Sequence, residues 1–240
     1  MRSETATPID EGDTTRQRDL VVLLVAIGAA VVLARVVATI TRSGGVPSPV
    51  AQVLAADAAV WVPLVVGAWW VLRHTTRSTV VARLRIDLGD VVFAVGIVII
   101  ARVVDVVLSI AVTGSTGLVP SPTLGTPDIG LLVVSAVGIV LVSPVLEEVI
   151  FRGLFQRRLA AELTPRTRFL AVLLTAFLFA LLHLLLGEAS TPVGGFQVVV
   201  TTFLLGALTG ALVAMTDRIG GAILAHVLFN AVAVVATWPR

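Results

Sequence analysis

Residues 143–152 of the chain read SPVLEEVIFR and directly follow an apolar run that begins at Ile129. Glu147, Glu148 and Arg152 therefore lie in or beside a segment long enough to enter a membrane. A charged side chain near the middle of a bilayer costs about 2.5–3.5 kcal/mol on insertion scales. Three such groups so close together must face protein or trapped water, and each must find a partner. Two other apolar segments supply the nearest candidates, the histidines His183 and His226.

The composition is that of a membrane protein. Hydrophobic residues make up 57% of the 240 residues and charged residues only 13%, against roughly 25% charged residues in an average soluble domain. All 17 basic residues are arginine, and the formal net charge of +2 gives no reason to expect nucleic-acid binding. The chain has no cysteine and no tyrosine, which excludes disulfides, thiolate metal sites and a tyrosine general acid.

The hydropathy pattern predicts an all-α polytopic membrane protein with about seven transmembrane helices, six to eight being compatible with the region around Pro144. We expect residues 1–19 to be a disordered cytoplasmic tail, residues 20–128 to hold the N-terminal transmembrane helices, and residues 129–240 to form a transmembrane core. The expected spans are residues 20–40, 50–72, 91–112, 129 to beyond 152, 168–186, 194–215 and 222–238.

Ser143 and Pro144 interrupt the fourth predicted span. A serine followed by a proline resembles a helix N-cap and the first helical position, so we expect a kink or break there, with Glu147 in the first turn beyond it. A break or a tilt is needed because simple span boundaries put His183 toward the outer end of its helix and Glu147 toward the cytoplasmic end of its own.

Arginine distribution predicts the orientation. The N-terminal tail, the loop at residues 73–85 and the region at residues 152–168 hold most of the arginines, and the intervening loops are almost free of them. The positive-inside rule therefore places the N-terminus and these basic regions in the cytoplasm. His74 lies in the second basic region and is expected to be solvated.

The spacing of the polar residues suggests a division of roles. Glu148 and Arg152 are four residues apart and stack on one side of a helix as an ion pair. Glu147, which shares its face with Phe151, is then free to act as a general base toward water. Each later pair also lies on one helical face, and these pairs are Phe179 with His183 and His226 with Asn230.

Imidazole and amide groups complete a possible hydrolytic set. Neutral histidine can accept a proton, donate to a developing oxyanion or bind a metal, and an asparagine amide can donate. Glu147, His183, His226 and Asn230 would therefore suffice to activate a water and stabilise a tetrahedral intermediate. Each alone has a structural explanation, such as a hydrogen bond between helices, but together they lie on three separate spans.

Other polar and small residues favour structural interpretations. Arg102 and Asp105 are spaced to pair locally, and with Arg35 and Asp57 we expect them to form a buried network or to snorkel. A transporter is an alternative function, since Asp57, Arg102 and Asp105 could line one pathway past a broken helix. A non-catalytic membrane scaffold is a further alternative. Gly206 and Gly210, spaced as in a GxxxG motif, predict close helix packing.

The three motifs in this order resemble the CAAX-protease and bacteriocin-processing (CPBP, or Abi) family of intramembrane endopeptidases. The residues that carry the resemblance are Glu147-Glu148-x-x-x-Arg152, Phe179-x-x-x-His183 and His226-x-x-x-Asn230. The resemblance implies a helical bundle whose site opens toward the cytoplasmic side, with residues 129–240 as the catalytic core. It also implies an integral membrane protein, and this short chain is similar to the prokaryotic members, which lie in the plasma membrane.

The resemblance also implies roles for the motif residues. Glu147 and His183 would activate a water, His226 and Asn230 would hold the oxyanion, and Glu148, Arg152 and Phe179 would shape the site. Glu147, His183 and His226 could ligate a zinc, but a glutamate mechanism without metal fits the same residues, and the sequence does not decide between them. The implied substrate is a membrane-associated protein or peptide, lipidated by prenylation in CAAX-type relatives and unprenylated in others.

Overall fold

A computed structural model describes residues 11–73, 83–120, 126–187 and 191–239 of the chain. Seven helices in this part are long and apolar enough to span a membrane, and no strand occurs in it. The predicted all-α membrane bundle is therefore confirmed, while His74 lies outside the described residues. The spans are α1 (Glu11–Arg42), α2 (Pro49–Leu72), α4 (Leu88–Thr113), a continuous fourth span (Ile129–Glu162), α8 (Phe169–Leu186), α9 (Pro192–Thr216) and α10 (Gly220–Thr237).

Capping chemistry sets several helix ends close to the predicted boundaries. Ser48 caps α2 through its side chain and is followed by Pro49, and Asp87 and Asp90 form a reciprocal capping box at the start of α4. The first helix differs from the prediction because it begins at Glu11. Residues 11–19, expected to belong to a disordered tail, thus extend α1 beyond the apolar run.

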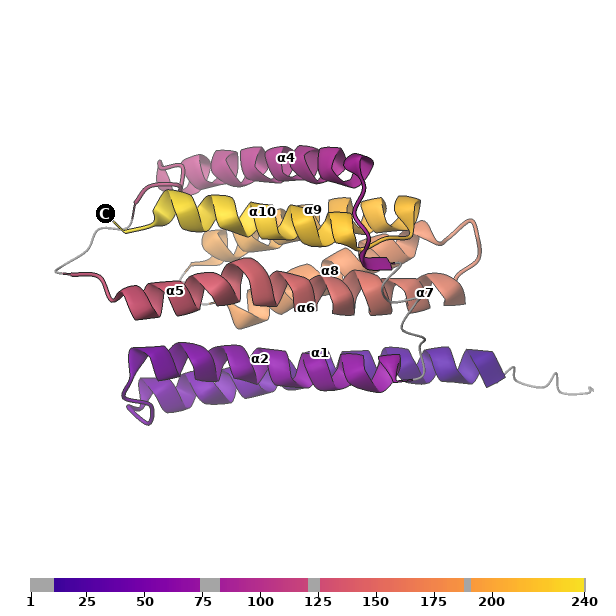
Figure 1. Ribbon diagram of the computed structural model, residues 1–240, viewed down its shortest axis with the longest axis horizontal. Helices are drawn as coiled ribbons and strands as arrows, with labels where there is room; N and C mark the ends of the chain where they lie inside the picture. Colours follow the sequence, from indigo (N-terminus) through magenta and orange to yellow (C-terminus); the bar gives the residue numbers. More distant parts are fainter. Residues whose placement is uncertain (1–10, 74–82, 121–125, 188–190, 240) are drawn as a thin grey trace, which may run out of the picture.

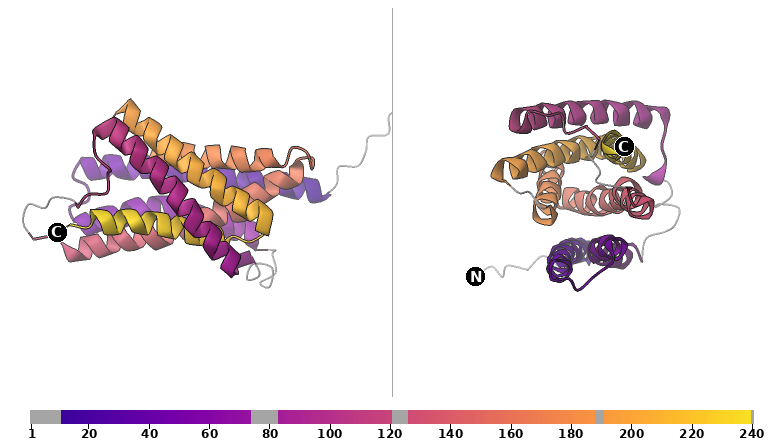
Figure 2. Two further views of the ribbon diagram at one scale, coloured as in Figure 1. Left: turned by 90° about the horizontal axis from the view of Figure 1, so that it is seen from above. Right: turned by 90° about the vertical axis from the view of Figure 1, so that its left-hand side faces the viewer.

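The helices are stacked in layers, and the helices that carry the motif residues lie in the middle (Figures 1 and 2). The α1–α2 hairpin covers one face, α4 covers the opposite face, and residues 129–237 lie between them. Leu23 and Leu64 of the hairpin pack against Phe151 and Phe179 in one buried apolar cluster. Ala101 of α4 packs against Leu205 and Phe229 in a second cluster. Both clusters fix the middle layer from outside.

The turn between α9 and α10 is tied to the start of α4. The Arg218 guanidinium donates hydrogen bonds to Asp90 and Asp87. The hydrogen bond with Asp90 is the main cause that raises the pKa of Arg218, and the charge of both carboxylates adds to it. The backbone N–H of Ile219 donates to the carbonyl of Arg83. These contacts hold the N-terminal end of α10, the helix that carries His226.

The fourth span is continuous, so the predicted break at Ser143 and Pro144 is wrong. Ser143 has helical dihedral angles, φ −60° and ψ −51°, and its hydroxyl accepts a hydrogen bond from the Trp61 indole instead of capping a helix. The span is built from α5 (Ile129–Val137), η1 (Gly138–Val142), α6 (Ser143–Glu148), η2 (Val149–Gln156) and α7 (Arg157–Glu162), where η1 and η2 are π-helical. Such π-turns inside α-helices are frequent at functional sites.

The length of this span also removes the apparent mismatch in depth. The helix runs on to Glu162, so Glu147 lies about 15 residues, or roughly 22 Å at 1.5 Å per residue, from that end. His183 lies a similar distance from the neighbouring start of α8 at Phe169. Glu147 and His183 therefore reach the same depth without a break, because the two helices run in opposite directions from a shared connection.

Candidate active site

Glu148 and Arg152 form a buried ion pair, as their spacing predicts. The Nη1 atom of Arg152 lies 3.1 Å from Oε1 of Glu148, and both side chains are fully buried. The nitrogen atoms of Arg152 nevertheless lack hydrogen-bond partners of good geometry among the described residues. Gly206 of α9 makes room for this guanidinium, since a Cβ atom there would stand 3.0 Å from Nη2. A buried charge without its partner is costly, so the pair fixes the helix in this place.

Phe179 of α8 packs between the charged groups of three helices. Its ring lies 4.3 Å from the guanidinium carbon of Arg152, a cation–π distance. The ring also contacts the imidazoles of His183 and His226, with centroid separations of 4.3 and 5.7 Å. Phe179 is fully buried. Its ring thus holds both histidines and the arginine at fixed positions around the motif.

Glu147 meets both intramembrane histidines. Its Oε2 atom lies 3.7 Å from Nε2 of His183 and 3.9 Å from Nε2 of His226. The same oxygen is buried and accepts no hydrogen bond from the described residues. Residues on three spans, separated by up to 79 positions in the printed sequence, thus converge on one carboxylate oxygen. The predicted set also includes Asn230, which is bound to the Ile139 carbonyl instead, so its convergence with Glu147 stays a prediction.

The other ring nitrogen of each histidine fixes which atom faces Glu147. Nδ1 of His183 lies 3.0 Å from the carbonyl oxygen of Phe179, which can only accept, so Nδ1 carries the hydrogen. Nδ1 of His226 lies 3.1 Å from Oε1 of Glu148 and donates to that carboxylate. If both rings are neutral, the Nε2 atoms of His183 and His226 are hydrogen-bond acceptors. Both lie near Oε2 of Glu147, which is also an acceptor. A water molecule or a proton would complete this arrangement.

Asn230 is held by a carbonyl that the π-turn leaves open. The Ser143 N–H donates to Gly138, five residues back, and the next donor in this pattern would be residue 144, a proline with no N–H. The Ile139 carbonyl accepts instead from Nδ2 of Asn230, at 2.8 Å. Pro144 therefore matters for the site through the donor that it lacks. The second N–H of the Asn230 amide makes no hydrogen bond within the described part of the chain and faces no competing partner there.

A cavity of about 450 Å³ opens beside these groups. Arg102 and Asp105 lie on its wall and form an ion pair at 2.7 Å, as predicted. Gln197 and Thr201 of α9 donate to Asp105. The transporter alternative requires Asp57 on the same pathway, but Asp57 does not line this cavity. Its other lining residues are Phe179, His183, Gly194, Val198, Thr202, Leu205, His226, Phe229 and Asn230.

The cavity lies at the end of the bundle that is poor in arginine. It is lined by the last turns of α8 and the first turns of α9, whereas the arginines at residues 157–168 lie at the opposite end. Between the cavity and that opposite end, Thr209 and Leu212 are buried. The prediction of a cytoplasmic N-terminus and the prediction that the site opens to the cytoplasm therefore point to opposite ends of the bundle, and both stay predictions.

The residues suggested as zinc ligands do not form a metal site as they stand. Within the described residues, no group of three or more His, Cys, Asp or Glu side chains is arranged to hold a metal. Zinc would need Glu147, His183 and His226 each at about 2.0–2.2 Å from one point. Zinc binding and the metal-free alternative both stay predictions, and no step below uses a metal.

Sequence reasoning missed several polar residues around the motif. Gln156 is buried, and its amide donates to the carbonyl of Gly210, so the Gly206 and Gly210 pair accommodates polar side chains as well as close packing against α8. Thr175 is buried without a hydrogen-bond partner for its hydroxyl among the described residues. Gln156 could have been identified from the sequence, because it lies four residues after Arg152 on the same span.

Comparison with known families agrees with the geometry. Residues 129–232 match the family described as type II CAAX prenyl endopeptidase, Rce1-like. No curated protein and no solved structure gives a match to the chain. All seven motif residues lie inside the matched segment, and the family is one of membrane proteases. Residues 129–232 of this chain are therefore similar to the Rce1-like type II CAAX prenyl endopeptidase family.

Proposed function

We propose that this protein is an intramembrane endopeptidase that hydrolyses a peptide bond of a membrane-associated protein or peptide. The observation that supports this most directly is the meeting of Glu147 with His183 and His226 at one buried oxygen atom. Oε2 of Glu147 and Nε2 of His183 are two acceptors that face each other, and a water molecule could donate one hydrogen to each. The cavity beside them leaves room for an extended peptide.

In the proposed reaction Glu147 accepts a proton from the water as the water oxygen attacks the scissile carbonyl carbon. His183 orients the water through its Nε2 atom. The carbonyl oxygen becomes an oxyanion, which His226 and the free N–H of Asn230 stabilise. The C–N bond then breaks, and the leaving nitrogen takes the proton from Glu147. The products are a carboxylate and an amine.

For His226 to donate to the oxyanion as well as to Glu148, both of its ring nitrogens must carry a hydrogen. Glu147, Glu148 and Arg152 together carry one net negative charge when all three are ionised, and uncompensated buried charge is costly. A proton on His226 would neutralise it. His226 would then donate through Nδ1 to Glu148 and through Nε2 toward the oxyanion. Glu148 and Arg152 would hold His226 in position.

Cleavage by purified protein in lipid vesicles tests the proposal. The substrates are prenylated and unprenylated C-terminal peptides of the same sequences, with products identified by mass spectrometry. We expect Glu147→Gln to lower kcat/KM by about 10²–10⁴-fold, the usual contribution of a general base. Glu162→Gln, at the end of the same span, is the matched control and should cleave normally.

The outcomes separate mechanism from substrate. Cleavage that is lost in Glu147→Gln and kept in Glu162→Gln supports the peptidase and identifies its substrate type. Equal cleavage by wild type and Glu147→Gln would remove Glu147 as the base and the mechanism with it. Failure of the wild type to cleave any peptide of the panel, prenylated or not, would count against a CAAX-type substrate.

A further inference from the structure

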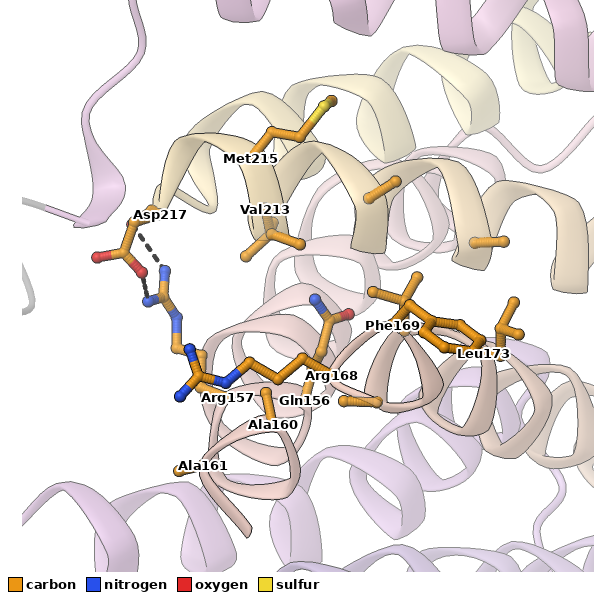
Figure 3. A pocket seen from close by; sticks show the side chains of 15 residues that line it. Gln156, Arg157, Ala160, Ala161, Arg168, Phe169, Leu173, Val213, Met215 and Asp217 are labelled. Carbon is orange, nitrogen blue, oxygen red and sulfur yellow. Dashed lines mark hydrogen bonds and ion pairs between the residues drawn. The ribbon is translucent and has the colours of Figure 1, made fainter. Parts of the chain in front are cut away.

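A second cavity, of about 780 Å³, lies at the opposite end of the bundle from the candidate active site. Figure 3 shows it between α7, the first turns of α8 and the last turns of α9. Its deep wall ends at Gln156, whose amide is bound to the Gly210 carbonyl. None of the seven motif residues lines it. The apolar lining residues are Ala160, Ala161, Phe169, Ala171, Val172, Leu173, Ala207, Ala211, Val213, Ala214 and Met215.

Charged side chains gather at only one side of this cavity. Arg157, Arg168 and Asp217 are its charged lining residues (Figure 3). Arg157 is engaged, since it forms an ion pair with the Asp217 carboxylate and donates to the Asp217 carbonyl. Arg168 is exposed and forms no ion pair within the described part of the chain. The lining therefore carries one net positive charge, on the arginine that is free to bind.

The position of the cavity suits a molecule that is apolar along one part and anionic at its end. Helix ends at Glu162, Phe169 and Thr216 surround it, which places the arginines where the spans leave the hydrocarbon. The trough between α8 and α9 faces the hydrocarbon itself, where only apolar chains are present. Basic pockets between transmembrane helices at a membrane surface are typical binding sites for anionic lipid head groups.

We propose that this cavity binds one anionic phospholipid, with an acyl chain in the apolar trough and the phosphate at Arg168 and Arg157. The Arg168 guanidinium binds the phosphate oxygens, because planar guanidinium groups match phosphate geometry. Arg157 supplies its remaining N–H groups from beside Asp217. The site does not depend on peptidase activity.

Native mass spectrometry of the full chain in detergent tests the site directly. The probes are dioleoyl-phosphatidylglycerol and dioleoyl-phosphatidylcholine, which share their acyl chains and differ in net charge. We expect preferential retention of one phosphatidylglycerol. Arg168→Gln should weaken its retention about fivefold, since an arginine near the surface contributes about 1 kcal/mol to binding an anionic lipid. Ala211→Phe, which fills the trough without changing charge, should weaken retention of both lipids.

Arg42→Gln is the matched control, because Arg42 is the last residue of α1 and does not line this cavity. This variant should retain phosphatidylglycerol as the wild type does. Equal retention of both lipids by the wild type, or an equal loss in Arg42→Gln and Arg168→Gln, would overturn the proposal. Full displacement of phosphatidylglycerol by millimolar inorganic phosphate would also overturn it, because the cavity would then be a simple anion site. Retention that Ala211→Phe leaves unchanged would show that the acyl chain does not enter the trough.

Discussion

The two ends of the bundle differ in where their charged side chains lie. On the side of the smaller cavity, buried Glu148 contacts Arg152 and His226, and Arg102 pairs with Asp105 on the cavity wall. At the arginine-rich end, the cavity wall is apolar and the charges stand at the surface. Buried charges need partners within the protein, whereas surface charges have water. The first end is therefore suited to chemistry and the second to contact with the membrane.

The largest expected effect is a difference in the free energy of unfolding between variants at the two ends. Arg152→Met removes the guanidinium that pairs with the buried Glu148, and breaking such a pair should cost about 3–5 kcal/mol. Asp217→Asn breaks the pair with Arg157 at the other end, where the Asp217 side chain is 79% exposed, and should cost at most about 1 kcal/mol. Unfolding in mixed micelles measures both.

A second variant distinguishes lost pairing from lost packing. Arg152→Met combined with Glu148→Gln removes the uncompensated carboxylate as well, and should recover part of the stability lost in Arg152→Met alone. If Arg152→Met and Asp217→Asn destabilise the protein equally, the contrast between buried and exposed charge at the two ends does not hold.

The sequence predicted the convergence at the first end because polar residues are conspicuous in apolar segments. Glu147, His183 and His226 stood out against long runs of Val, Leu and Ala, and helical spacing identified which neighbours share a face. Span boundaries were predictable for the same reason. The apolar cavity at the second end was invisible, since Ala207 and Ala211 in a membrane helix look alike whether they pack against protein or leave a trough.

The role of Pro144 was not predictable from local rules. Ser143 followed by Pro144 has the form of a helix start. The helix nevertheless continues through a π-helical turn, in which the Ser143 N–H donates to the Gly138 carbonyl although Pro144 has no N–H to donate. The partner that satisfies the open Ile139 carbonyl is Asn230, which lies far along the chain. A sequence motif shows that Pro144 is unusual, and only the tertiary contact shows why.

A smaller effect is expected from restoring that N–H. In Pro144→Ala the new backbone donor competes with Asn230 for the Ile139 carbonyl, so Asn230 loses its fixed position. We expect kcat for peptide cleavage to fall about tenfold, equivalent to about 1.4 kcal/mol, with little change in KM. Pro63→Ala, inside α2, is the matched control for removing a helical proline. A similar fall in both variants, or a rise in KM without a change in kcat, would argue against a positioning role.

The smallest perturbation decides which end faces the cytoplasm. The chain contains no cysteine, so single cysteines at exposed or cavity-lining positions can be labelled without background. Thr116 lies at the arginine-poor end, Thr164 at the arginine-rich end, and Thr202 lines the smaller cavity. Thr116 and Thr164 are exposed, so these two changes should each alter stability by at most about 0.5 kcal/mol.

Positive residues favour the cytoplasmic side, so a membrane-impermeant maleimide on intact cells should label Thr116→Cys and Thr202→Cys but not Thr164→Cys. Substrates would then reach Glu147 from the outer face, which favours translocated or outer-leaflet peptides over cytoplasmic prenylated proteins. The reverse pattern would place the cavity in the cytoplasm and restore the CAAX-type substrate as the better candidate. Labelling of Thr202→Cys from the same side as Thr164→Cys, and opposite to Thr116→Cys, would show that the cavity opens past the arginines. The two ends would then no longer have separate tasks, because substrate and lipid would enter from one surface.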